Sequence, residues 1–234
     1  MTDSCWLSRV RLGRAASVKA LMPLLQQGTG PGGHGSADVD RRLIWSLFAD
    51  GPDRRRDFLW RRMDDGAFLV LSARRPEDRH GLFEIDEPKA FAPALASGNG
   101  LRFSLRANPT VRKSREPGQR HAPRHDVVMD AIHPLSDGSR AERRMSATRE
   151  KGFDWLARQG CKAGFEIREN ELLCEGYRQH RIVRGAGERS LSFSSLDFEG
   201  VLEVRQPDLL TSAIARGFGP SKAFGCGLML IRRL

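Results

Sequence analysis

The chain has 234 residues, of which 39% are hydrophobic and 29% are charged, so it can bury a core beneath a heavily charged surface. No stretch approaches about 18 uninterrupted apolar residues, and the sequence therefore predicts no membrane span. It carries 39 Lys and Arg against 29 Asp and Glu, a formal net charge of +10, and arginines greatly outnumber lysines. This balance favours a polyanionic partner, nucleic acid ahead of a membrane surface. A generally basic proteome from a GC-rich genome would give the same bias.

The N-terminus mixes acidic and basic residues and lacks the basic start and apolar run of a signal peptide, which predicts a cytoplasmic protein. The four cysteines lack the spacing of a metal site, and a cytosolic chain of this length needs no disulfide framework. We expect small buried side chains at Cys5, Cys161, Cys174 and Cys226. His121 and His125 have helical spacing, but Pro123 lies between them and no carboxylate is aligned as a third ligand. We therefore expect no metal site and no cofactor.

The first part of the chain alternates between strand and helix patterns. Polar and apolar residues alternate over residues 5–12, which predicts a half-buried strand. A short helical stretch at 17–27 and a glycine-rich loop at 28–35 follow, and Ser36 or Asp38 can cap the next helix.

Two further strands at 58–62 and 67–72 flank an Asp65-Gly66 hairpin turn. Strand, helix, strand, strand is the first three-quarters of a ferredoxin-like unit. The stretch 88–99, with its prolines, alanines and glycine, indicates a linker.

The second part repeats these ingredients. A strand begins again at residues 100–109, and a basic loop extends through 102–124. A helix is predicted around 146–159 and a short one at 208–216, with strands at 165–168, 172–177, 179–183, 191–196, 198–204 and 227–232. The expected fold is α+β, with two tandem ferredoxin-like (RRM-like) domains at residues 1–90 and 100–234, joined by a linker at 91–99.

Two segments carry candidate nucleic-acid contacts. A hairpin around residues 178–189 is loaded with basic side chains that can reach phosphates or base edges, although a solvated surface hairpin has the same composition. The glycine-rich segment 217–229 permits close backbone approach to a phosphate around Lys222, although it can also be a structural turn. It fits neither the Walker A spacing nor a dinucleotide fingerprint. We expect RNA contacts at Arg106, Lys113, Arg178, His180, Arg181, Arg184, Arg189 and Lys222.

Together these pieces resemble the CasE-type CRISPR-associated endoribonucleases, the precursor-RNA processing subunit of the type I-E Cascade complex. The resemblance extends in order over nearly the whole chain, through Trp6 to Val10, 42–48, 101–109, 198–202 and 217–228. It implies that the protein binds the stem-loop of a CRISPR repeat and cuts the RNA at the 3′ base of the stem. It further implies a metal-independent reaction that leaves a 2′,3′-cyclic phosphate, after which the enzyme stays on its product beside other Cascade subunits, including the backbone subunit.

The sequence departs from the family at the catalytic position. Members of the family usually place a histidine directly before a segment like Arg42-Leu-Ile-Trp45, and here that position is Arg41. Arginine stays protonated and cannot serve as an ordinary general base.

Three explanations remain open. Arg41 can stabilise the charge on the phosphorane, His34 can enter from the glycine-rich loop, or the protein binds RNA without cutting it. A DNA-binding regulator is disfavoured, because no helix-turn-helix with a basic second helix is evident.

Overall fold

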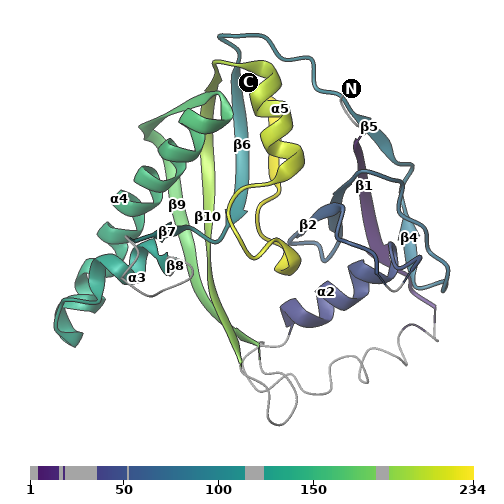
Figure 1. The fold of residues 1–234 in the computed structure, drawn as a ribbon, viewed down its shortest axis with the longest axis horizontal. Coiled ribbons are helices and arrows are strands. Elements are labelled where there is room, and N and C mark those ends of the chain that lie inside the picture. The colour runs from purple at the N-terminus through teal and green to yellow at the C-terminus, as the bar shows by residue number, and fades with distance from the viewer. Residues whose placement is uncertain (1–4, 16–17, 19–35, 52, 114–123, 183–189) are drawn as a thin grey trace.

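The computed structural model describes residues 5–15, 18, 36–51, 53–113, 124–182 and 190–234. Figure 1 shows two larger antiparallel sheets standing side by side, each with its own helices. Among the described residues, no helix combines the length and the apolar character needed to cross a membrane.

The first sheet has the strand order of a ferredoxin-like unit. Its strands are β1 (Cys5–Leu12), β2 (Phe58–Arg62), β3 (Phe68–Ser72) and β4 (Phe83–Ile85), in the antiparallel order β2-β3-β1-β4. Helix α2 (Ser36–Ser46) connects toward β2, and a short strand β5 (Lys89–Phe91) pairs with β1. Residues 73–82, where a second crossover helix would stand, contain none.

The second sheet belongs to a complete ferredoxin-like unit. In chain order the unit contains β6 (Gly100–Ala107), α4 (Asp137–Ala163), β9 (Phe165–Ile182), β10 (Leu191–Val204), α5 (Pro207–Arg216) and β11 (Met229–Arg233). The strands pair in the order β11-β6-β10-β9, all antiparallel. The remaining elements are β7 (Thr110–Arg112), β8 (Arg124–Asp126), α3 (Val127–Ile132) and the 3-10 helix η1 (Lys222–Phe224), which lies between the two units beside α2 (Figure 1).

Alternation along β2 explains how the two units join. Phe58 and Trp60 point into a core under α2, whereas Leu59 between them belongs to the larger core of the second unit. Successive strand residues point to opposite faces, so the first sheet buries one face against α2 and the other against its neighbour. Arg61 also donates a 2.7 Å hydrogen bond to Ser104 on β6. The two sheets therefore share one apolar cluster.

The two-unit α+β fold expected from the sequence is confirmed, and several boundaries differ. Helix α4 begins at Asp137, well before residue 146, because its first turns are charged and exposed and give no apolar periodicity. The three strands expected between 165 and 183 form one long strand, β9. Residues 89–91, within the stretch 88–99 whose composition indicated a linker, pair with β1, and α3, β4, β7 and β8 were not expected. The helix at 17–27, apart from Val18, and the loop at 28–35 lie outside the described residues.

Candidate active-site pocket and nucleic-acid interface

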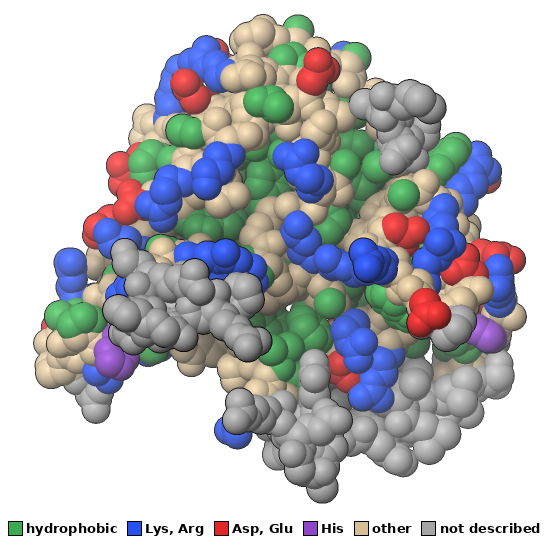
Figure 2. Space-filling view, in the orientation of Figure 1, with side chains coloured by type: hydrophobic (Ala, Val, Ile, Leu, Met, Phe, Trp, Pro, Cys, Tyr) green, Lys and Arg blue, Asp and Glu red, His purple; other side chains and the backbone are tan. Residues whose placement is uncertain are grey.

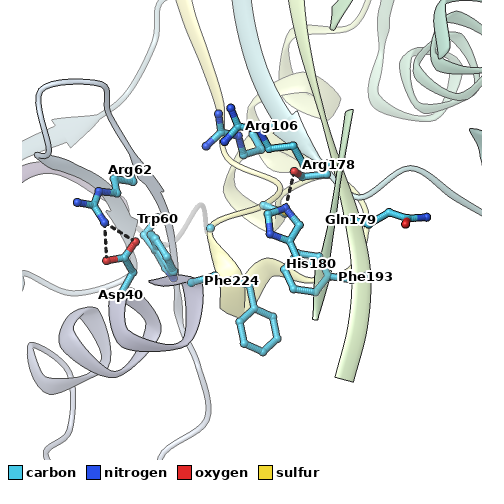
Figure 3. Close-up of a pocket in the computed structure, with 13 residues that line it drawn as sticks. Asp40, Trp60, Arg62, Arg106, Arg178, Gln179, His180, Phe193 and Phe224 are labelled. Atoms are coloured by element: carbon cyan, nitrogen blue, oxygen red, sulfur yellow. Dashed lines mark hydrogen bonds and ion pairs between the residues drawn. The ribbon is translucent and has the colours of Figure 1, made fainter. Parts of the chain in front are cut away.

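A pocket of about 640 Å³ opens where the two units meet. Figure 3 shows Asp40, Trp60 and Arg62 on one side, and His180 with Phe193 on the other. The walls come from α2 and β2 of the first unit and from β6, β9 and β10 of the second. The glycine-rich segment contributes the remaining wall, through Phe224, Gly225 and Cys226. The fold thus brings the helix expected to carry the catalytic position to the basic strand β9.

An ion pair anchors the wall that the first unit contributes. The Arg62 Nη1 atom lies 3.0 and 3.1 Å from the two carboxylate oxygens of Asp40, which is only 6% exposed. Burial raises the pKa of Asp40 above its usual range, although the charge of Arg62 opposes this effect. Trp60 beside them is buried. This wall therefore holds a carboxylate with a perturbed pKa at the pocket surface, which is a feature of functional sites.

An imidazole on β9 lines the opposite wall. His180 Nε2 lies 2.8 Å from the hydroxyl of Ser195 on β10, and Ser195 is buried. The His180 ring stacks on Phe193 with centroids 4.6 Å apart, and Phe193 stacks on Phe224 at 5.1 Å. Three stacked rings therefore connect β9 and β10 to the glycine-rich segment and fix the orientation of the imidazole.

Two arginines complete this wall. Arg106 on β6 donates hydrogen bonds of 2.7 and 2.8 Å to Asp197 on β10, which raise the pKa of Arg106. Arg178 on β9 is exposed and makes no ion pair with any residue that the structure describes. Arg178 is therefore the guanidinium of this pocket that is ready to receive an anionic group.

Positive backbone φ angles let the glycine-rich segment fit between the units. Gly225 has φ +80°, and a Cβ at this position would lie 2.9 Å from the Trp60 ring. Gly227 N donates to Arg106 O at 2.7 Å, and Phe218 N donates to Gly227 O at 2.9 Å, so the segment is tied to β6 and to itself. Cys226 is almost fully buried, and burial raises the pKa of its thiol to about 12. At position 225, glycine is therefore required for packing against Trp60 as well as for the positive φ angle.

A second pocket of about 530 Å³ is lined by an earlier part of the glycine-rich segment, Gly219 to Lys222. Four cationic side chains line it, and none of the described lining residues is acidic: Arg56, Arg112, Arg124 and Lys222. The Nη1 atom of Arg56 is buried without a hydrogen-bond partner among the described residues. Burial, with the nearby charges of Arg56 and Arg216, lowers the pKa of Lys222. Figure 2 shows basic side chains in a broad band across this face, over both halves of the molecule.

The structure gathers some of the expected site residues and separates others. Arg106, Arg178 and His180 line the first pocket, Lys222 lines the second, and Arg181 lines a neighbouring cavity with Tyr177. Lys113 instead pairs with Asp130 at 2.5 Å, outside both pockets. His34, Arg184 and Arg189 lie outside the described residues.

Arg41 lies beside the pocket rather than in its lining. It occupies α2, next to Asp40 and one turn after Ala37, both of which line the pocket. Its Nε donates a 2.8 Å hydrogen bond to Asp38, which Arg42 also contacts at 2.7 Å. Burial opposes ionisation of Asp38, but the two arginines outweigh it and lower the pKa of that carboxyl. Asp38 therefore holds Arg41 along the helix surface.

Several lining residues carry no signal that sequence reasoning could use. Asp40 and Arg62 are ordinary charged residues of a helix and a strand, and Phe193 and Ser195 fit an unremarkable strand pattern. Their importance comes from packing between segments far apart in the chain. Helical spacing from Arg41 could have pointed to Ala37, four residues earlier on the same face of α2, but not to its neighbour Asp40. No group of three or more potential metal ligands occurs among the residues that the structure describes.

Fold and site define a protein of two ferredoxin-like units with basic pockets at and beside their junction. A family model described as "CRISPR associated protein" matches residues 5–233. The CRISPR-associated endoribonuclease Cse3 of Thermus thermophilus is 30% identical over 210 residues, 83% of this chain and 88% of the relative. The Cascade subunit CasE of Escherichia coli K12 is 26% identical over 197 residues, 82% of this chain and 89% of the relative. The chain therefore belongs to the CRISPR-associated protein family and is of the CasE type.

Solved structures agree on the fold. A CRISPR endoribonuclease Cse3 bound to a 19-nucleotide RNA superimposes with a TM-score of 0.66 at 22% identity, over 98% of each chain. The crystal structure of Cas6e from Escherichia coli K-12 gives a TM-score of 0.60 at 22% identity, over 98% of this chain and 100% of the other. Both comparisons support the two-unit ferredoxin-like architecture.

Proposed function

We propose that the protein is a metal-independent endoribonuclease that binds the stem-loop of a CRISPR repeat and cuts precursor CRISPR RNA at the 3′ base of the stem. The product would carry a 2′,3′-cyclic phosphate, and the protein would remain on it as a Cascade subunit. The Thermus relative is named an endoribonuclease, and the Escherichia coli relative is named a Cascade subunit. The observation that carries the proposal is the interdomain pocket, because it gathers Arg106, Arg178 and His180 beside α2.

Charge supports RNA as the ligand. The chain has a formal net charge of +10, and the pocket around Lys222 contains four cations without a described acidic residue. Neutralising phosphates with such groups releases condensed counterions, which drives binding at low salt. The stacked rings of His180, Phe193 and Phe224 add a surface on which a base can stack.

The reaction places three demands on the pocket. The 2′-hydroxyl must lose its proton, the phosphorane must be stabilised, and the attacking oxygen must lie in line with the leaving 5′-oxygen. Arg41 and Arg178 can serve the second demand, because a guanidinium stays charged and presents a planar fork to phosphate oxygens. His34 in the glycine-rich loop remains a proposed contributor to the first.

The donor groups of the pocket favour a mechanism without metal. Asp40 is the carboxylate of the described lining, and Arg62 neutralises it. Divalent ions that assist phosphoryl chemistry prefer several oxygen ligands, which this lining does not offer. Arginines can supply the positive charge that a metal would otherwise bring to the phosphorane.

A second function from the same family deserves a test, namely a subunit that binds the CRISPR RNA hairpin without cutting it. The observation that favours it is the pairing of Arg41 with Asp38, because a charged and paired guanidinium cannot accept a proton. In this alternative the basic pockets would hold the guide RNA. Other Cascade subunits, including the backbone subunit, would complete the assembly.

The deciding experiment is cleavage of a repeat RNA in the presence of EDTA, with analysis of the product ends. The proposal expects cleavage at the base of the stem, with a 5′-hydroxyl and a 2′,3′-cyclic phosphate. Arg41→Ala and His34→Ala then identify which residue the reaction requires. Tight binding without cleavage by the unmodified protein would establish the non-cleaving alternative. Failure to bind the stem-loop would overturn both functions.

A further inference from the structure

We infer that His180 on β9 is the catalytic base of the interdomain pocket and takes the proton of the attacking 2′-hydroxyl, in place of a histidine at position 41. The inference rests on the proposed cleavage of RNA and goes beyond the expected role of His180 as a binding residue. It assigns the acid–base step to the second ferredoxin-like unit, whereas the expected catalytic position lies on α2 of the first.

The position of the imidazole supports this role. His180 lines the same pocket as Ala37 and Asp40, which lie four residues and one residue before Arg41 on α2. Figure 3 shows the ring at the pocket wall, facing the side that carries Asp40 and Trp60. A general base has to lie within hydrogen-bond reach of the 2′-hydroxyl of the sugar that enters the pocket.

Two contacts hold the ring in the orientation that catalysis requires. Stacking on Phe193, with planes inclined by 14°, fixes the plane of the imidazole. Ser195 Oγ lies 2.8 Å from Nε2, and Ser195 is itself 4% exposed. In the tautomer that catalysis requires, Nε2–H donates to the Ser195 hydroxyl and the lone pair of the ring lies on Nδ1, which takes the proton. The same contact is kept in the imidazolium, so Ser195 supports His180 both before and after the proton is transferred.

The chemistry balances with no further reactant. The imidazole of His180 takes the proton of the 2′-hydroxyl as O2′ forms its bond to phosphorus. The bond between phosphorus and O5′ then breaks, the 5′-oxygen takes a proton from water, and the imidazolium returns its proton to solvent. Arg178 on the same strand can contact the non-bridging oxygens, because it has no ion pair with described residues.

The charged groups around the pocket define what else could titrate there. Asp40 and Arg62 face His180 from α2 and β2, whereas Arg106, held by Asp197, and Arg178 approach from β6 and β9. The Cys226 thiol stays neutral because its pKa is raised to about 12. Asp40 is the competing base, since burial raises the pKa of its carboxyl. A test therefore has to separate His180 from Asp40.

The pH dependence of the unmodified protein is the first measurement. Single-turnover cleavage at saturating enzyme, with EDTA present, should rise with pH and level off once the general base is deprotonated. His180→Asn should lower the plateau rate by about 10²–10⁴-fold and remove this rise. Affinity for a repeat RNA with a 2′-deoxy sugar at the cut site should change by less than about threefold, because the rings of Phe193 and Phe224 and the phosphate contacts remain when the imidazole is removed.

Matched variants complete the test. His80→Asn replaces an exposed histidine outside the pocket and should leave rate and pH profile unchanged. Asp40→Asn should keep the pH-dependent rise, whatever its effect on rate, and external imidazole should partly restore cleavage to His180→Ala.

Three outcomes would overturn the inference while the proposed function stands: a rate that is flat with pH in the unmodified protein, an unchanged profile in His180→Asn, or a rise that disappears in Asp40→Asn instead. Tight binding without any cleavage by the unmodified protein would overturn the inference and the cleavage function together.

Discussion

The Nη1 atom of Arg62 on β2 lies 3.0 Å from one carboxylate oxygen of Asp40 on α2 and 3.1 Å from the other. The pair joins the helix to the sheet at the wall of the interdomain pocket. Asp40 is buried, whereas about half of the Arg62 side chain is exposed, with 47% of its surface accessible. Among the residues that the structure describes, the carboxylate therefore depends on one charged partner that solvent partly screens.

Arg62→Gln should destabilise the protein near neutral pH by roughly 1–2 kcal/mol, less than the loss from a fully buried pair because solvent screens the arginine. The pKa of Asp40 is raised above 3.8 in the folded state, so the ionised carboxylate costs stability as pH rises through its folded pKa. The loss should shrink in mildly acidic buffer. Urea unfolding at both pH values checks this, with Asp40→Asn/Arg62→Gln as the control. A loss independent of pH would contradict the explanation.

Arg41→Ala should lower the single-turnover cleavage rate by about 10²–10³-fold, the usual loss when one donor to a developing oxyanion is removed. Affinity for uncleavable repeat RNA should change little, because many other cations remain. Arg42→Ala is the matched control, since Arg42 shares the carboxylate of Asp38 but is 65% exposed on the helix surface. Equal losses in both variants would show that the effect passes through Asp38 and the stability of α2.

Local patterns in the sequence predicted the strands and the two-unit plan, because alternation and helix caps depend on near neighbours. Contacts between distant segments could not be predicted from these local patterns. Arg106 was expected to contact RNA, but its guanidinium also binds Asp197, its partner across the β6–β10 pairing. The glycine-rich segment was expected to approach a phosphate, and only the fold reveals that Gly225 lies against Trp60.

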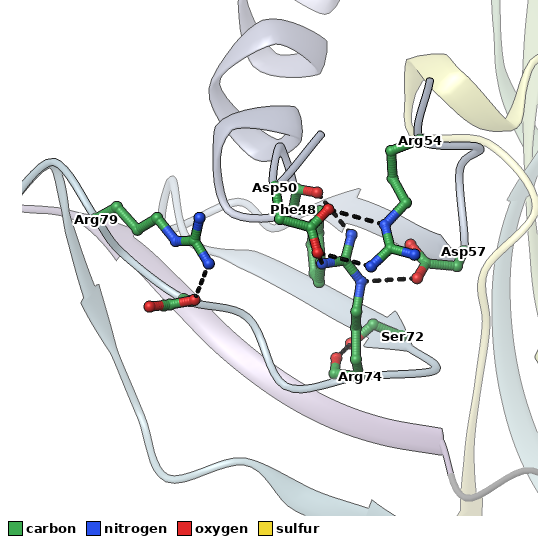
Figure 4. Close-up of polar contacts among 8 residues, drawn as sticks. Phe48, Asp50, Arg54, Asp57, Ser72, Arg74 and Arg79 are labelled. Atoms are coloured by element: carbon green, nitrogen blue, oxygen red, sulfur yellow. Dashed lines mark hydrogen bonds and ion pairs between the residues drawn. The ribbon is translucent and has the colours of Figure 1, made fainter. Parts of the chain in front are cut away.

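Arg74 ties the end of α2 to the first sheet, and Figure 4 shows its contacts. It donates to the Phe48 carbonyl at 2.6 Å and contacts Asp50 at 2.7 Å and Asp57 at 2.8 Å. Arg74→Ala should lower stability by about 2 kcal/mol, because several hydrogen bonds from a charged group are lost. Thermal unfolding measures the change, and Arg79→Ala, which removes a pair with exposed Glu77, should leave Tm unchanged.

The same network predicts acid sensitivity. Hydrogen bonding from Arg54, with the charges of Arg54 and Arg74, lowers the pKa of Asp50 from 3.8 to about 2. A carboxyl group whose pKa is lowered in the folded state stabilises the protein at any pH above the pKa of the unfolded state. This contribution is lost as pH falls from about 4 toward 2. Arg74→Ala should therefore show a shallower loss of stability over this window. An identical acid profile in the variant would contradict the role of Arg74.

Gly225→Ala and Gly66→Ala form a matched pair, because both glycines have similar positive φ angles of +80° and +79°. A Cβ at position 66 meets nothing within 4 Å, whereas one at position 225 meets Trp60 at 2.9 Å. Gly66→Ala should cost about 1–2 kcal/mol for the left-handed backbone alone. Gly225→Ala should cost a further 1–3 kcal/mol or so from overpacking, and it should slow cleavage by displacing Phe224. Equal losses in urea unfolding would show that the segment moves aside freely.

Arg112 and Arg124 stand directly opposite each other in the β7–β8 pair and both line the second basic pocket. Like charges directly opposite on neighbouring strands destabilise a sheet, and neither arginine has an ion pair among the described residues. An RNA phosphate between them would relieve the repulsion. Replacing both by Gln should therefore weaken binding of repeat RNA and reduce the slope of log affinity against log salt by about 1–2, since each phosphate contact contributes about 0.7–0.9.

The free protein should respond in the opposite direction. Removing the opposed charges should leave the stability of the Arg112→Gln/Arg124→Gln variant unchanged or slightly raise it at low salt, because repulsion between the strands is lost while no ion pair with described residues is broken. Arg75→Gln/Arg79→Gln removes two exposed, ion-paired arginines and should leave the salt slope unchanged. Weaker binding with an unchanged salt slope would mean that the two arginines maintain the conformation of the β7–β8 pair and do not contact phosphate. Weaker binding with a shallower slope and undiminished stability would mean that this pocket holds phosphate.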